Sequence, residues 1–162
     1  MSYLAHRLAW LLLGAMLGLP AQGWCTQVND DLGRPVALAQ AAQRIVTLAP
    51  HATELVLAAG GRDRLVGVAA GGGNPPSIAA LPRVGGPGAL DREQLLSLRP
   101  DLVIAWQSGN RASDLEWIER IGIALYLSEP RSLRDIASTI RAIGRLADHS
   151  PTAEQAALRF EQ

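Results

Sequence analysis

The sequence contains no lysine, so all 15 of its basic residues are arginines. Without a lysine amine, the chain cannot perform Schiff-base chemistry or hold phosphates through the lysine of a P-loop or a kinase. A single cysteine, Cys25, excludes an intrachain disulfide and any zinc or iron–sulfur site built on several cysteines. We expect neither a metal site nor a cofactor.

An excess of charge of either sign is also missing, because 15 basic residues balance 15 acidic ones. A dedicated nucleic-acid-binding protein normally carries a basic excess, so we expect no nucleic-acid partner. Hydrophobic residues make up 48% of the chain and charged residues 19%, which is typical of a globular protein rather than a disordered one.

The N-terminal segment has the pattern of a secretory signal. The apolar run 8–19 follows the basic residue Arg7 and is shorter than the about 20 residues that a membrane-spanning helix needs. Ala21 and Gly23 supply small residues at the two positions of a cleavage site. The pattern predicts a signal peptide over residues 1–23, cleaved after Gly23.

Cys25 lies just beyond the predicted cleavage site, where a lipid anchor could be attached. A lipoprotein signal places the modified cysteine directly after a small residue, whereas Trp24 precedes Cys25 here. We therefore expect an exported, soluble chain rather than a lipid-anchored one.

The remaining chain alternates between strand and helix patterns. Four short apolar runs without polar alternation indicate strands buried on both faces, as in a parallel sheet: 44–48, 65–68, 102–106 and 124–127. Helical segments lie between or after them, at 52–59, 91–98, 110–121 and 132–147. Asp91, Asn110 and Ser132 are the expected N-caps of the last three. A hairpin is predicted at 28–36, and Ser150-Pro151 begins a last helix.

Ligands of open parallel sheets bind beyond the carboxyl ends of the strands. The segments that follow the strands contain four candidate ligand-binding residues: His51, Gly71, Trp106 and Asn110. Trp106 could instead be an aromatic residue at the edge of the core. His51 could instead be a metal ligand or an ordinary polar residue at this edge of the sheet. Glycines 71–73 lack the spacing of a phosphate-binding loop, and no Ser/His/Asp, Cys/His or carboxylate pair indicates a catalytic site.

Two stretches carry a resemblance to a known family. The first is 44–55 (RIVTLAPHATEL) with 59–60 and 65–68, and the second is 83–95 followed by 98–106 (LRPDLVIAW). Together they resemble the N-terminal lobe of periplasmic binding proteins that serve ABC importers for cobalamin, haem and iron–siderophores. The segment 103–110 is most similar to the cobalamin-binding branch. That branch carries a tyrosine where Gly71 stands and a bulky aromatic near 87–88, both of which this chain lacks.

The resemblance implies an α/β fold: the Rossmann-like, parallel-sheet N-terminal lobe of a helical-backbone (class III) binding protein. The lobe would occupy residues 24–150, and 151–162 would begin the interlobe helix, with the second lobe absent. The implied function is capture of a corrinoid in the periplasm by a monomer that delivers it to an ABC permease in the inner membrane. Glu93 matches the position at which such proteins present a glutamate to permease arginines for docking.

Several alternatives remain open at this point. The ligand of the same family could be an iron–siderophore or haem instead of a corrinoid. The chain could also be a truncated, non-functional fragment of a longer protein. An exported α/β enzyme is a further alternative because fold alone does not assign function, but we expect no enzymatic activity.

Overall fold

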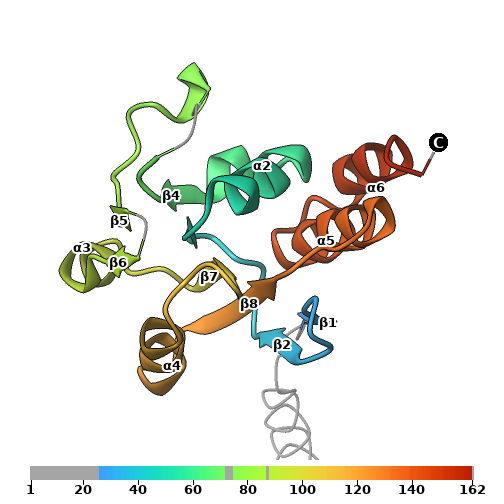
Figure 1. The fold of residues 1–162 in the computed structure, drawn as a ribbon. Helices are drawn as coiled ribbons and strands as arrows, with labels where there is room; N and C mark the ends of the chain where they lie inside the picture. Colours follow the sequence, from blue (N-terminus) through green and yellow to red (C-terminus); the bar gives the residue numbers. More distant parts are fainter. Residues whose placement is uncertain (1–25, 72–74, 87, 162) are drawn as a thin grey trace, which may run out of the picture.

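The computed structural model describes residues 26–71, 75–86 and 88–161 (Figure 1). The predicted signal peptide, its cleavage site and Cys25 lie outside the described residues. Within the described residues, none of the helices combines the length and the apolar character needed to cross a membrane.

A four-stranded parallel sheet forms the centre of the fold, as the four apolar runs predicted. Its strands lie in the order β4-β3-β7-β8. Their bounds are β3 (Ile45–Thr47), β4 (Leu65–Gly67), β7 (Leu102–Trp106) and β8 (Ala124–Ser128). In the register of β7 and β8, Ile104 pairs with Tyr126 and Trp106 with Ser128. The carboxyl ends of β7 and β8 therefore lie side by side.

Helices cover both faces of this sheet (Figure 1). One layer contains α2 (Pro50–Ala58), α5 (Leu133–Leu146) and α6 (Ser150–Leu158), and the other contains α3 (Arg92–Ser97) and α4 (Ala112–Arg120). Strand residues alternate between two hydrophobic cores: Ile45 packs with α2 and α5, whereas its neighbour Val46 packs with α3 and α4. The α/β class and the parallel sheet are confirmed.

The helix starts show which predicted caps form. Asp91 and Ser132 cap α3 and α5, because their side chains accept hydrogen bonds from the backbone N–H groups of Gln94 and Asp135. The prediction for Asn110 was wrong, since Arg111 occupies the N-cap position of α4 and provides no side-chain cap. The Asn110 side chain forms longer-range hydrogen bonds instead.

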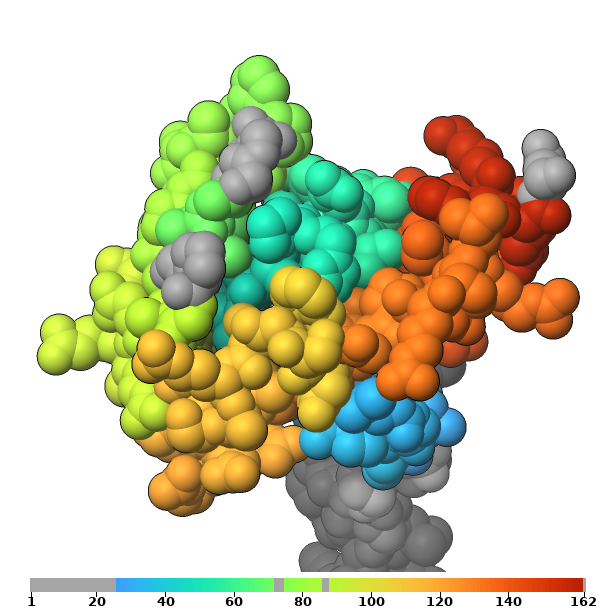
Figure 2. All heavy atoms as spheres, in the orientation of Figure 1, coloured from blue at the N-terminus to red at the C-terminus, as the bar shows by residue number. Residues whose placement is uncertain are grey.

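The predicted N-terminal hairpin is present and packs against the outer strand of the sheet. It consists of the antiparallel strands β1 (Thr26–Asn29) and β2 (Pro35–Leu38). The backbone N–H of Asp31 donates to the carbonyl of Leu127 (3.2 Å), and the N–H of Leu127 donates to an Asp30 carboxylate oxygen (3.4 Å). Figure 2 shows the hairpin in blue, packed against the orange atoms of α5 and β8.

Some elements were not predicted from the sequence. They are the short antiparallel pair β5 (Gly85–Gly86) and β6 (Ala89–Leu90) and the 3-10 turns η1 (Gly61–Arg64) and η2 (Pro76–Ile78). Helix α6 begins at Ser150, as expected, but it ends at Leu158 rather than continuing through the C-terminal residues.

Candidate functional site

The ends of β3 and β7 bring two candidate ligand-binding residues into contact. Pro50 occupies the first turn of α2, so the short connection from β3 places His51 at the start of that helix. The rings of His51 and Trp106 meet edge to face, with centroids 5.3 Å apart and planes at 88°. Trp106 is 40% exposed, so its indole is a surface aromatic and not a core residue.

Asn110 fixes the backbone around this pair. Its side-chain oxygen accepts a hydrogen bond from the N–H of Trp106 (2.7 Å), and its side-chain nitrogen donates to the carbonyl of Leu48 (3.1 Å). Leu48 follows β3 and Trp106 ends β7, so one amide side chain joins the ends of two adjacent strands. Asn110 thus lies where the sequence placed it, next to Trp106.

Gly109 allows the indole of Trp106 to lie directly on the loop backbone. A Cβ atom built at Gly109 would overlap the six-membered ring of Trp106. The loop and the indole are therefore in close contact.

The environment of His51 favours the neutral imidazole. Burial lowers the pKa of His51 below its ordinary value, and the carboxylates of Glu129, Glu54 and Asp31 oppose this effect only in part. The Nε2 atom is buried and has no hydrogen-bond partner among the described residues. The site therefore contains an uncharged ring nitrogen with unused hydrogen-bonding capacity.

A chain of hydrogen bonds supports the Trp106 loop from the side of β8. The Glu129 carboxylate accepts from both the N–H and the hydroxyl of Ser108, at 3.1 Å each. The N–H of Glu129 donates to Asp31 (2.8 Å), whose other oxygen accepts from the hydroxyls of Tyr126 and Thr139, at 2.7 Å each. Burial and the nearby Asp31 charge raise the pKa of Tyr126, which stays a protonated donor.

Sequence reasoning missed this support. Asp31 lies within the predicted hairpin 28–36 and Glu129 just after the predicted strand 124–127, but neither was among the candidate residues. The two aspartates between β1 and β2 would have been a signal, because a turn needs only one such side chain to form its local hydrogen bonds.

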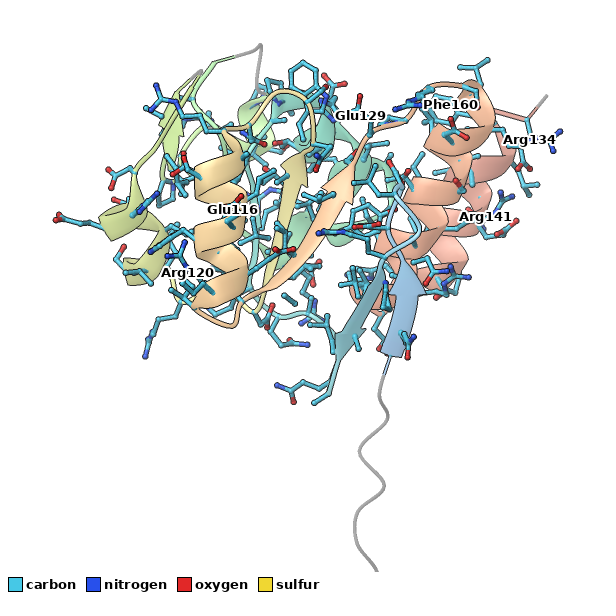
Figure 3. All side chains as sticks on the ribbon, turned by 60° about the horizontal axis from the view of Figure 1, so that its bottom comes forward. Glu116, Arg120, Glu129, Arg134, Arg141 and Phe160 are labelled. Carbon is cyan, nitrogen blue, oxygen red and sulfur yellow. The ribbon has the colours of Figure 1, made fainter. Side chains whose placement is uncertain are left out.

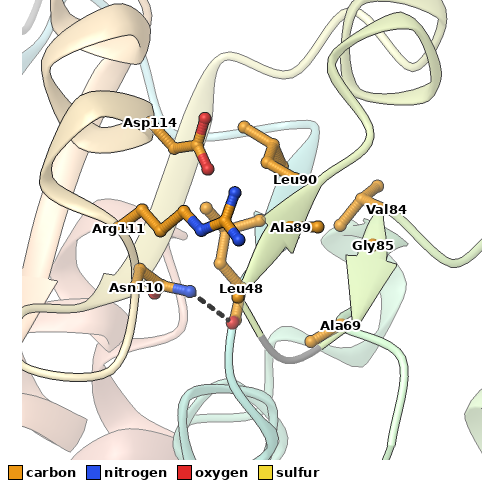
Figure 4. Close-up of a pocket in the computed structure, with 10 residues that line it drawn as sticks. Leu48, Ala69, Val84, Gly85, Ala89, Leu90, Asn110, Arg111 and Asp114 are labelled. Carbon is orange, nitrogen blue, oxygen red and sulfur yellow. Dashed lines mark hydrogen bonds between the residues drawn. The ribbon is translucent and has the colours of Figure 1, made fainter.

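A shallow, open pocket lies beside Asn110 at the same end of the sheet, and its cavity of about 20 Å³ has room for about one water molecule (Figure 4). Residues at the ends of β3 and β4, the β5–β6 pair and the start of α4 line it. The guanidinium of Arg111 extends into the pocket between Leu90 and Asn110, as the close-up shows. Like Asp31 and Glu129, Arg111 was not among the residues predicted from the sequence.

The other two predicted residues lie apart from the His51–Trp106 pair. Gly71 is exposed in the segment after β4, with a φ of +99°, and nothing lies within 4 Å of the position that its Cβ would occupy. Glu93 is exposed in the first turn of α3, at the second helical position that the Asp91 cap implies.

The chemistry of the site is that of a binding surface. It offers an exposed aromatic face, a neutral imidazole and an arginine, all held by hydrogen-bonded loops. Across the described part of the chain, no three His, Cys, Asp or Glu side chains group in a way that could hold a metal ion.

Comparisons with known sequences agree with this description. The sequence profile of the periplasmic binding protein family matches residues 45–162. The vitamin B12-binding protein of Vibrio cholerae serotype O1 is 38% identical over 121 residues, which are 75% of this chain and 44% of that protein. The vitamin B12-binding protein of Yersinia pestis is 38% identical over 124 residues, or 76% of this chain and 44% of the relative.

Solved structures show the same relationship. The periplasmic vitamin B12-binding protein of Vibrio cholerae superposes with a TM-score of 0.71 at 38% identity, covering 75% of this chain and 48% of that structure. A periplasmic haem-binding protein from Pseudomonas aeruginosa gives 0.68 at 30% identity, covering 75% and 44%. The chain spans less than half the length of these relatives. By sequence and by fold, it belongs to the periplasmic binding protein family.

Proposed function

We propose that this chain captures a large planar metal-chelate ligand in the periplasm for delivery to an ABC permease, with a corrinoid as the first candidate. The observation that carries the proposal is the exposed indole of Trp106, backed by Gly109 and braced by the edge contact with His51. A flat apolar face held in a fixed orientation is suited to stacking on a macrocycle. The vitamin B12-binding relatives support the corrinoid, and the role is binding rather than catalysis.

Haem is the second candidate because of a specific observation at the site. A neutral imidazole is a common ligand of haem iron, and the Nε2 atom of His51 has no partner among the described residues, although the ring would have to turn to bring this buried atom to a ligand at the surface. The haem-binding relative with 30% identity supports the same alternative.

Export and domain organisation form part of the same proposal. Residues 1–23 are the signal peptide, 24–150 the N-terminal ligand-binding lobe, and 151–162 the start of the interlobe helix. The periplasmic relatives support this location.

Replacing Trp106 tests the binding role. Trp106→Leu keeps an apolar side chain but removes the stacking face, so affinity for cyanocobalamin or haemin should fall by roughly 2- to 10-fold, equivalent to about 0.5–1.5 kcal/mol. Absorbance titration of the purified chain measures the change. Trp117→Leu is the matched control, because Trp117 lies on α4 against Arg92 and not at the rim. Equal affinities for the two variants would contradict the proposal.

Glu93 is proposed to dock the lobe on the permease. Its exposed carboxylate lies on a capped helix and is free to accept a two-pronged contact from an arginine of the partner. Glu93→Ala should weaken binding to the reconstituted permease while leaving ligand affinity unchanged. Glu116→Ala, an exposed glutamate on α4, is the control. If both variants bind the permease like the unmodified chain, Glu93 only stabilises its helix.

A further inference from the structure

The pocket beside the Trp106 loop has apolar walls and a positively charged group inside. Leu48, Val84 and Leu90 line its sides, and Gly88 lies beside the Arg111 side chain. A Cβ atom at Gly88 would lie 3.8 Å from both Nε and Nη2 of Arg111. The glycine backbone and the guanidinium are thus neighbours, and Arg111 lies across the pocket in Figure 4.

The charge of Arg111 is not neutralised by its surroundings. Asp114 is the only other charged residue that lines the pocket, and its Oδ1 atom already accepts two hydrogen bonds from Arg92, at 2.7 and 3.2 Å. Arg92 is itself fixed, because its guanidinium also lies 4.7 Å from the ring centre of Trp117. Among the described residues, Arg111 forms no salt bridge, and its side chain is solvent-accessible.

The pocket adjoins the proposed stacking surface. Asn110 is the link, since it lines the pocket and its side chain also binds the backbone of Trp106. The cavity holds only about 20 Å³, so a corrinoid or porphyrin ring cannot enter it, and a ligand can meet Arg111 only with a substituent at the open mouth of the pocket. A ligand lying on Trp106 would therefore extend a substituent, not its ring, toward Arg111.

We propose that Arg111 binds an anionic side arm, a carboxylate or a phosphodiester, of the ligand whose flat face stacks on Trp106. The inference rests on the proposed function for the ring but adds the chemical class of its substituent. A guanidinium presents paired N–H donors that match the oxygens of either anion. Arg111 is thus a specificity-determining residue.

Paired probes with and without the anionic arm test this inference on the purified chain. Haemin carries two carboxylates that its dimethyl ester lacks, and cyanocobalamin carries a nucleotide arm with a phosphodiester that dicyanocobinamide lacks. Arg111→Gln should lower the affinity for the probe that carries the anionic arm by roughly tenfold and should change the affinity for the probe without it little. A response of the haemin pair alone identifies a carboxylate arm, and a response of the cobalamin pair alone identifies a phosphodiester.

Arg120→Gln is the matched control. Arg120 is also an exposed arginine, but it is the last residue of α4, at the opposite end of the helix from Arg111 and the strand ends (Figure 3). This variant should bind all four probes like the unmodified chain. Equal effects of Arg111→Gln on the charged and the neutral probe of each pair would overturn the inference.

A titration with inorganic phosphate separates this inference from the proposed function. The amide resonances of Gly88 and Asn110 should shift in the unmodified chain and in Arg120→Gln but not in Arg111→Gln. If no macrocycle binds while this response persists, the proposed function fails and the anion site stands. If no macrocycle binds and phosphate moves neither resonance, the anion site fails as well.

Discussion

Gly109 and Trp106 show how a missing side chain positions a large one. Any Cβ atom at position 109 would overlap the indole, so the ring can lie on the loop only because the residue is glycine. The edge contact with His51 then sets the tilt of the ring. The orientation of the proposed stacking surface is therefore fixed before any ligand arrives, which reduces the entropy lost on binding.

The protonation of His51 makes stability depend on pH. Burial lowers its pKa in the folded protein below the ordinary value of 6.5, so the unfolded chain binds more protons between those two pKa values. The free energy of unfolding should therefore fall as the pH decreases through this window, and His51 should contribute no slope above about pH 7.

Urea unfolding of His51→Gln between about pH 7 and pH 5 measures this contribution. The variant should show a flatter decline than the unmodified chain. His149→Gln is the control, because His149 lies away from the rim, beside Asp63, and its replacement should keep the decline due to His51. Parallel profiles for His51→Gln and the unmodified chain would contradict the assignment.

At the scale of elements, Asp31 connects the hairpin, β8 and α5 through one carboxylate. Asp31→Ala removes the acceptor of the Tyr126 hydroxyl, whose side chain is only 1% exposed. Leaving that group unsatisfied should cost about 1–3 kcal/mol of unfolding free energy, measured by denaturant titration. Amide exchange at Ser108 should also accelerate, because Glu129 loses its backbone anchor.

Glu116→Ala is the comparison for Asp31→Ala. Glu116 is an exposed carboxylate on α4, and its removal should change the unfolding free energy by less than about 0.5 kcal/mol. Equal stabilities of the two variants, with unchanged exchange at Ser108, would show that Asp31 does not support the Trp106 loop.

The elements that could be predicted from the sequence are those specified by local patterns. The four apolar runs predicted the parallel strands, and the Asp91 and Ser132 caps formed because each bond spans only three residues. Asn110 was misassigned because an asparagine before a helix is also able to bind a distant carbonyl, here 62 residues away in Leu48. Local spacing contains no information about such a partner.

The hydrogen bonds that support the candidate site were also missed because they join residues far apart in the sequence. Asp31 and Tyr126 are 95 residues apart, and Ser108 and Glu129 are 21 apart, so these contacts depend on how the strands are arranged. The β5–β6 pair has only two residues in each strand, too few to give an alternating pattern. Arg111 became a candidate only when the structure placed it in a pocket.

For the whole molecule, strand order determines which groups meet at the rim. His51 follows β3, Trp106 ends β7, and Glu129 follows β8, and these three strands are adjacent in the sheet. A shift of one residue in the pairing of β7 and β8 would move Trp106 by about 3.3 Å along the strand. The hydrogen bonds that Ser108 donates to the Glu129 carboxylate hold the register at the end where the proposed ligand contacts lie.

The hairpin has a further consequence for the molecule in solution. In the described part of the chain, β8 is the last strand of its sheet, and an outer strand with free N–H and C=O groups is a template for another copy of the same chain. The hairpin turn occupies both backbone groups of Leu127 on that side. A variant lacking residues 26–38 should therefore self-associate at concentrations where the complete chain does not, which light scattering would detect. Absence of concentration-dependent assembly would show that β8 needs no such protection.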